Sequence, residues 1–317
     1  MGKVAFIFPG QASQYSGMGK ELSEKFAAAR AVFEEADDAL GISVSKMCFE
    51  GTEEELKLTA NTQPAILAVS VAALRVLAER GVTADYVAGH SLGEYSALVA
   101  ASSLNFADAV KLVRKRGTYM QEAVPAGQGA MAAIMGLSPT VVLDVCKRAG
   151  QGEVCSAANL NSPEQTVISG HAGAVKRAVE IASQSGAKRA VMLAVSAPFH
   201  SELMKPAQEK LERDLAGTKF ADLQMPLVTN VDADSIRQGE EARSALVRQV
   251  TMPVRWEESM RMLLDEGVNT FVEVGPGKVL TGLMRQIERS VTTLNVEDEK
   301  SLVATLDKIT GAKSDAA

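Results

Sequence analysis

A serine between two glycines carries the clearest chemical signal in this chain. Ser91 lies at the centre of Gly89-His90-Ser91-Leu92-Gly93, which is a G-x-S-x-G pattern. This pattern predicts a reactive serine when a strand precedes it and a helix follows, and we expect a strand over 86–88 and a helix over 92–101. The first N–H groups of such a helix favour a developing oxyanion. We therefore predict that Ser91 is a nucleophile; a glycine-rich turn with a capping serine is the alternative.

The base that activates this serine must be sought among three histidines. A serine hydroxyl becomes a nucleophile when a base takes its proton, and the chain contains His90, His171 and His200. The side chain of His90 should diverge from its neighbour at a sharp turn, and His171 lies between a strand and a helix of a separate unit. His200 lies in a loop at the edge of the main body and follows the serine in the chain, as in α/β-hydrolases. We predict His200 as the base, although no Asp or Glu stands out to fix its tautomer; a surface or core histidine is the alternative.

Arg116 is a charged residue on an apolar helical stripe. In the helix expected over 106–123 it lies in line with Ala109, Val113 and Met120. A charge on a buried face is costly unless it is paired. Its partner could be an internal carboxylate, or a carboxylate that the substrate brings to the guanidinium fork. The side chain could also reach solvent at the helix end, so the spacing leaves three alternatives open.

The segment between residues 125 and 196 differs in rhythm from the rest of the chain. It predicts strands and helices in the order βαββαβ, over 130–135, 139–149, 153–159, 165–169, 172–185 and 189–193. This order is that of a ferredoxin-like unit, and we expect it to be inserted into a larger α/β body. Between its second and third strands, the run from Asn159 to Pro163 predicts a polar turn.

Composition narrows the class of protein. The 317 residues carry a net charge of −6, with 46% hydrophobic and 4% aromatic residues, which suits aliphatic helices packed on a mostly parallel sheet. The charge argues against a nucleic-acid partner, and three cysteines without paired spacing predict neither disulfides nor a metal site. The longest apolar segment, 65–74, is shorter than the ~20 residues that a membrane span needs. We expect a cytoplasmic protein without a membrane partner.

Six short motifs occur in a fixed order along the chain. They are Phe8-Pro9-Gly10-Gln11, Gly89-His90-Ser91-Leu92-Gly93-Glu94-Tyr95, Arg116-Gly117, Pro198-Phe199-His200, Asn230-Val231 and Glu273-Val274-Gly275-Pro276-Gly277. Together they resemble the malonyl-CoA:acyl carrier protein transacylases of bacterial fatty-acid synthesis, over about residues 3 to 310. The resemblance implies an α/β fold with an α/β-hydrolase-like large subdomain (1–124 and 197–317), which has a mostly parallel sheet, and an inserted ferredoxin-like small subdomain (125–196).

The resemblance also assigns roles to individual residues. It implies that Ser91 is the nucleophile, that His200 is the base and that Arg116 holds the malonyl carboxylate. The backbone carbonyl of Gln249 would orient the histidine in place of a triad acid.

Two further residues would form the oxyanion site. The resemblance implies that Gln11 positions this site together with the backbone N–H of Leu92. Phe199 stands where some relatives have a smaller residue, and it could narrow the pocket beside the base.

The implied reaction moves a malonyl group between two thiols. Malonyl-CoA would acylate the serine, CoA would leave, and the phosphopantetheine thiol of acyl carrier protein would take the malonyl group, with ping-pong kinetics. Neither a metal nor a bound cofactor is expected, and we expect a monomer. A serine hydrolase, a non-catalytic carrier-protein-binding module and a transferase for methylmalonyl groups remain the alternatives.

Overall fold

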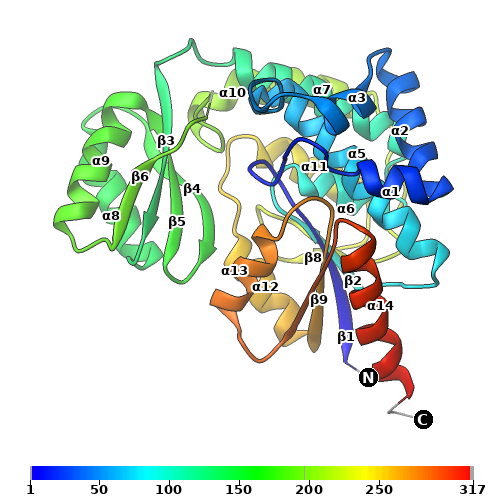
Figure 1. Ribbon diagram of the computed structural model, residues 1–317. Helices are drawn as coiled ribbons and strands as arrows, with labels where there is room; N and C mark the ends of the chain where they lie inside the picture. Colours follow the sequence, from blue (N-terminus) through cyan, green and yellow to red (C-terminus); the bar gives the residue numbers. More distant parts are fainter. Residues whose placement is uncertain (1, 196, 315–317) are drawn as a thin grey trace.

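Two sheets organise the molecule and lie in separate parts of it (Figure 1). The structure, a computed structural model, describes residues 2–195 and 197–314. Within these residues one sheet has six strands in the order β10-β9-β1-β2-β7-β8, and the other has four in the order β4-β5-β3-β6. The predicted fold class, α/β with a mostly parallel sheet and a second small sheet, is confirmed.

The six-stranded sheet is built around the first apolar run of the chain. Its strands are β1 (Lys3–Phe8), β2 (Tyr86–Gly89), β7 (Leu227–Val228), β8 (Ser235–Ile236), β9 (Val268–Val274) and β10 (Thr292–Val296). Neighbouring strands are parallel, apart from the edge pair β7 and β8. Ala5 to Phe8 are buried on both faces, which explains why the apolar run does not alternate. Phe8 lies opposite Gly89, so the loop after β1 lies beside the turn after β2.

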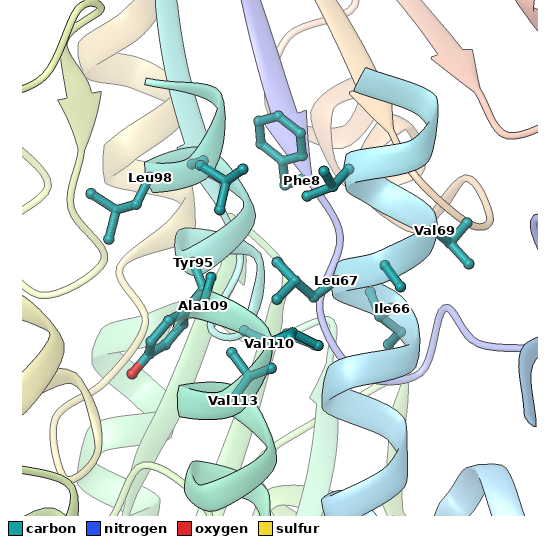
Figure 2. Close-up of a cluster of buried hydrophobic side chains, with 14 of the residues drawn as sticks. Phe8, Ile66, Leu67, Val69, Tyr95, Leu98, Ala109, Val110 and Val113 are labelled. Atoms are coloured by element: carbon teal, nitrogen blue, oxygen red, sulfur yellow. The ribbon is translucent and has the colours of Figure 1, made fainter. Parts of the chain in front are cut away.

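Helices cover both faces of this sheet. They are α1 (Lys20–Lys25), α2 (Ala27–Leu40), α3 (Val44–Glu50), α4 (Glu53–Lys57), α5 (Thr59–Glu79), α6 (Gly93–Ala100), α7 (Phe106–Glu122), the 3-10 helix Glu202–Met204, α10 (Lys205–Ala216), α11 (Gly239–Gln249), α12 (Trp256–Asp265), α13 (Val279–Ile287) and α14 (Glu299–Ser314). On one face α5, α6 and α7 pack against β1 through a cluster that includes Phe8, Tyr95 and Val113 (Figure 2). On the other face α12 and α13 pack on β9 through a second cluster that includes Trp256 and Phe271.

Helix α5 lies inside the larger apolar cluster. Its length and apolar composition would suffice to cross a membrane, but 83% of its most apolar window is buried inside the protein. Its contacts are with α2, α7 and other helices of the same body. The helix is therefore part of the core.

The four-stranded sheet is antiparallel and carries two helices. Its elements are β3 (Gly129–Met135), α8 (Pro139–Gly150), β4 (Cys155–Ser162), β5 (Gln165–His171), α9 (Ala172–Gln184) and β6 (Arg189–Met192). The order βαββαβ is the predicted one. A separate apolar cluster that includes Ile134, Val145 and Val175 joins the sheet to α8 and α9. The proposed subdomain boundaries stay a prediction, and residue 196, which ends the small subdomain, lies outside the described residues.

Some local expectations were wrong. The predicted turn from Asn159 to Pro163 is not a turn over most of its length, because β4 continues through Ser162. β4 stays paired with β5 as far as Ser162 and Gln165, and the large body gives it a second neighbour: Leu160 N–H donates to the Val254 carbonyl at 2.9 Å, and Val254 N–H donates to the Ala158 carbonyl at 2.8 Å. The pattern over 21–40 predicts one helix, but the structure has two helices there, because Phe26 between them has extended backbone.

Candidate active site

Ser91 lies in a sharp turn between β2 and α6. Its φ is 51°, in the left-handed region that side chains rarely adopt. The turn is possible because glycine flanks it: a Cβ on Gly89 would lie 1.9 Å from the Gly93 carbonyl carbon, and one on Gly93 would lie 2.1 Å from the Phe8 carbonyl oxygen. The predicted strand–turn–helix context of the serine is therefore present.

The structure brings Ser91 and His200 together. Ser91 Oγ and His200 Nε2 are 2.8 Å apart, although the two residues are 109 positions apart in the chain. His200 Nδ1 lies 2.8 Å from the backbone carbonyl oxygen of Gln249. A carbonyl oxygen only accepts, so Nδ1 carries the proton and Nε2 presents its lone pair to the serine hydroxyl. Burial, and next the charge of Arg116, lower the pKa of His200 from 6.5 to about 3, which keeps the imidazole neutral and able to take a proton.

Two backbone N–H groups of residues that line or adjoin the serine turn have no acceptor among the described residues. Leu92 is the N-cap residue of α6, and Gln11 follows the end of β1. Among the residues described, neither the Leu92 N–H nor the Gln11 N–H donates to another protein atom. The Gln11 side chain donates to Thr59 Oγ1 at 3.5 Å and accepts from Gln63 at 3.4 Å. Free donors at the start of a helix are suited to an oxyanion.

Arg116 is buried beside the serine and makes no ion pair within the described part of the chain. Its exposed fraction is 1%, which rules out the alternative that the side chain reaches solvent. Nη1 donates to Gln63 Oε1 at 2.8 Å, and Nη2 donates to Gln249 Oε1 at 2.9 Å and to Ser91 Oγ at 3.1 Å. Burial lowers the pKa of Arg116. The guanidinium is thus held by neutral amides, and its charge has no carboxylate in contact.

Comparison with known proteins gives a match over almost the whole chain. The family profile described as Acyl transferase domain matches residues 5–312. The chain is 52% identical over 303 residues to the malonyl CoA-acyl carrier protein transacylase of Bacillus subtilis (strain 168), which covers 95% of this chain and 96% of that relative. The chain belongs to this family of acyltransferases.

Solved structures agree with this assignment. An acyl-carrier-protein S-malonyltransferase from Bartonella henselae superposes on the acyltransferase with a TM-score of 0.95 at 48% identity, covering 98% of this chain and 100% of the other. A malonyl-transacylase solved in complex with a type II PKS acyl-carrier protein has a TM-score of 0.94 at 46% identity, covering 96% and 99%. The fold and the family are therefore common to all three chains.

A buried polar residue that sequence reasoning gave no role holds the serine turn of the acyltransferase in place. Asn230 Oδ1 accepts from the Ser91 backbone N–H at 2.7 Å, and its Nδ2 donates to the Gly89 carbonyl at 2.6 Å. Asn230 is 0% exposed and lies just after β7, the strand that pairs with β2. It belongs to a motif of the family resemblance, but no local pattern pointed to this contact.

The acyltransferase has a cavity of about 370 Å³ between its two sheets. The large body lines it with polar residues that include Gln11, Ser91 and His200, and with apolar residues that include Met120, Phe199 and Leu280. The small sheet lines it with Met131, Ala133, Met135 and Val167 and with the polar Asn159, Asn161 and Gln165, and the segment after β6 adds Leu193 and Val195. Phe199 lies beside the base, where the sequence placed it.

The other two histidines of the acyltransferase do not contact the serine hydroxyl. His90 Nε2 lies 2.8 Å from Asn161 Oδ1, which joins the serine turn to β4 of the small sheet. His171 Nδ1 accepts from the Val154 backbone N–H at 2.9 Å. Asn161 and Asn159, from the run predicted as a turn, line the cavity instead.

Proposed function

We propose that this acyltransferase moves a malonyl group from malonyl-CoA to the phosphopantetheine thiol of an acyl carrier protein, through a malonyl ester on Ser91. The proposal rests mainly on one observation: the buried guanidinium of Arg116 lies 3.1 Å from the Ser91 hydroxyl and has no carboxylate partner among the described residues. A substrate that carries a carboxylate two bonds from its reacting carbonyl would supply that partner. The relatives' name, malonyl CoA-acyl carrier protein transacylase, supports the same substrate.

The first half of the reaction acylates the serine. Ser91 Oγ attacks the thioester carbonyl while its proton moves to His200 Nε2, and the Gln249 carbonyl keeps the imidazole oriented through Nδ1. The N–H groups of Leu92 and Gln11 would stabilise the oxyanion, by roughly 3 kcal/mol for each donor in comparable sites. The C–S bond breaks, and the CoA thiolate takes the proton from His200.

The second half reverses these steps with a new thiol. The phosphopantetheine thiol of the carrier protein gives its proton to His200 and attacks the malonyl ester, and the Ser91 oxygen recovers the proton when it leaves. The chemistry needs only protein groups and the two thiols, so we propose that no metal or bound cofactor takes part. The relative solved with an acyl-carrier protein supports this class of partner. We propose further that the enzyme is a cytoplasmic monomer and supplies fatty-acid chain elongation.

Intact-mass measurement after mixing with malonyl-CoA tests the proposal. We expect one malonyl adduct per chain, which is absent in Ser91→Ala and is lost when holo acyl carrier protein is added. No adduct on the folded wild-type protein would contradict the mechanism and favour a binding module. Continuous release of CoA without an acceptor, far beyond one equivalent, would favour a hydrolase instead.

A further inference from the structure

Glu94 is a buried carboxylate that the steps above do not use. It lies three residues after Ser91 in α6 and is 0% exposed. Its Oε2 accepts from Gln249 Nε2 at 2.8 Å and from the Asn230 backbone N–H at 3.1 Å. In the described part of the chain its Oε1 has no hydrogen-bond partner. A carboxylate at this depth carries a desolvation cost, so its contacts with residues around the nucleophile suggest a function.

The contact with Gln249 determines which way the Gln249 amide points. Nε2 donates to Glu94 Oε2 and, at 3.0 Å, to the Ser91 backbone carbonyl, whereas Oε1 accepts from Arg116 Nη2 at 2.9 Å. If the amide turned over, its N–H groups would face the guanidinium, donor against donor. The Ser91 carbonyl and Asn230 Oδ1, which lies 3.4 Å from Nε2, also only accept, and Glu94 Oε2 is the nearest of the three acceptors. Glu94 therefore favours the orientation in which the amide oxygen holds Arg116.

We propose that Glu94 is a positioning residue for malonyl selection, which acts through the Gln249 side chain on Arg116. This inference rests on the proposed function, because it assumes that Arg116 holds the malonyl carboxylate. The arrangement places a carboxylate one amide away from the guanidinium rather than in contact with it. The guanidinium is then held in place while its own donors stay available to a substrate carboxylate. Since Oε2 accepts hydrogen bonds in either protonation state of Glu94, an amide oxygen at this position should serve as well.

Two substitutions at Glu94 test this role. Glu94→Leu removes the acceptor, and Glu94→Gln keeps an acceptor oxygen of the same reach. We expect Glu94→Leu to lower the ratio of malonyl-CoA to acetyl-CoA acylation rates of Ser91 by about tenfold or more, because displaced catalytic groups cost factors of this order. Glu94→Gln should stay within about threefold of the wild-type ratio. Rates are measured by intact mass, and thermal melting establishes that each variant is folded.

A control variant, Ser96→Ala, and a variant of the neighbouring residue, Gln249→Leu, distinguish a positioning role from a general loss of structure. Ser96→Ala changes another buried polar residue of α6, whose hydroxyl has no partner in the described residues, and should leave the ratio unchanged. Gln249→Leu should lower the ratio as Glu94→Leu does, and the double variant should lower it no further, because both act through one contact.

Three results would overturn the inference. They are an unchanged ratio in Glu94→Leu or Gln249→Leu, equal losses in Glu94→Leu and Glu94→Gln, and losses that add in the double variant. Failure of the proposed function looks different, since the wild-type protein would then form no malonyl adduct at all.

Discussion

The cavity has two walls, one from the large body and one from the small sheet. They differ in how their side chains are held in place. On the large body, Ser91, His200 and Arg116 are fixed by side-chain and backbone hydrogen bonds of 2.8–3.1 Å. On the small sheet, Met131 and Val167 are held by the register of neighbouring antiparallel strands. The first wall therefore depends on contacts between distant segments, and the second on one contiguous segment.

This difference distinguishes side chains that carry out the reaction from side chains that determine the shape of the cavity. A hydrogen-bonded group that is displaced by a fraction of an ångström loses its partner, whereas an apolar side chain can be replaced by one of similar volume at modest cost. Substitutions of the hydrogen-bonded groups on the large-body wall should therefore change the rates of malonyl transfer by orders of magnitude. Substitutions of apolar lining residues, among them Phe199 on the large body, should change which acyl group fits.

The largest effect is expected for the nucleophile. Ser91→Ala should lower malonyl transfer to acyl carrier protein by at least about 10³-fold, because no other group can form the ester. Met131→Ala, on the opposite wall, should lower it by less than about tenfold. Steady-state transfer assays on both variants, with thermal melting to exclude unfolding, measure the contrast. Comparable losses in the two folded variants would contradict the division between the walls.

The second effect concerns Arg116. Arg116→Ala should lower acylation by malonyl-CoA by about 10²-fold or more, since a charge-assisted bidentate contact is lost. Acylation by acetyl-CoA, which has no carboxylate, should fall far less. Single-turnover rates of Ser91 acylation by the two thioesters measure this difference. Equal losses of rate would contradict a carboxylate-binding role for Arg116.

The same contrast explains what the sequence could predict. The small subdomain is contiguous, so local periodicity was enough to predict its βαββαβ order. The G-x-S-x-G pattern indicated Ser91, and the short list of histidines led to His200. The Gln249 carbonyl came only from the family resemblance. The Asn230 contacts with the serine turn were not predictable, because they depend on the pairing of β2 with β7, about 140 residues apart in the chain.

A third expectation concerns Phe199, a large apolar side chain that directly precedes the base in the chain. Phe199 is 7% exposed and lines the cavity, so it limits the space beside His200. Phe199→Ala should raise the ratio of methylmalonyl to malonyl transfer by about tenfold, the effect of one methyl group in a fitted pocket. Competition between the two CoA thioesters measures the ratio. Met131→Ala is the comparison from the other wall, and a larger increase there would show that the small sheet limits acyl size instead.

The smallest effect on the acylation rate is expected from a change in pH, because His200 is buried. The pKa of His200 is lowered to about 3 in the folded protein, so the imidazole stays neutral from pH 8 down to pH 5. Acylation of Ser91 at saturating malonyl-CoA should then change by less than about twofold over this range, measured by rapid-quench intact mass. A fall in rate centred near pH 6.5 would show that the base titrates as an exposed histidine does.

Stability should depend on pH where the acylation rate does not. The unfolded chain protonates His200 near pH 6.5, and the folded protein does so only near pH 3. Between these values His200 binds more protons in the unfolded state, so its contribution to the free energy of unfolding decreases as the pH falls from about 6.5 towards 3. His200→Gln removes this contribution, and its melting temperature should fall less steeply over the same range. If the melting temperatures of wild type and variant fell equally steeply with pH, burial would not hold the imidazole neutral.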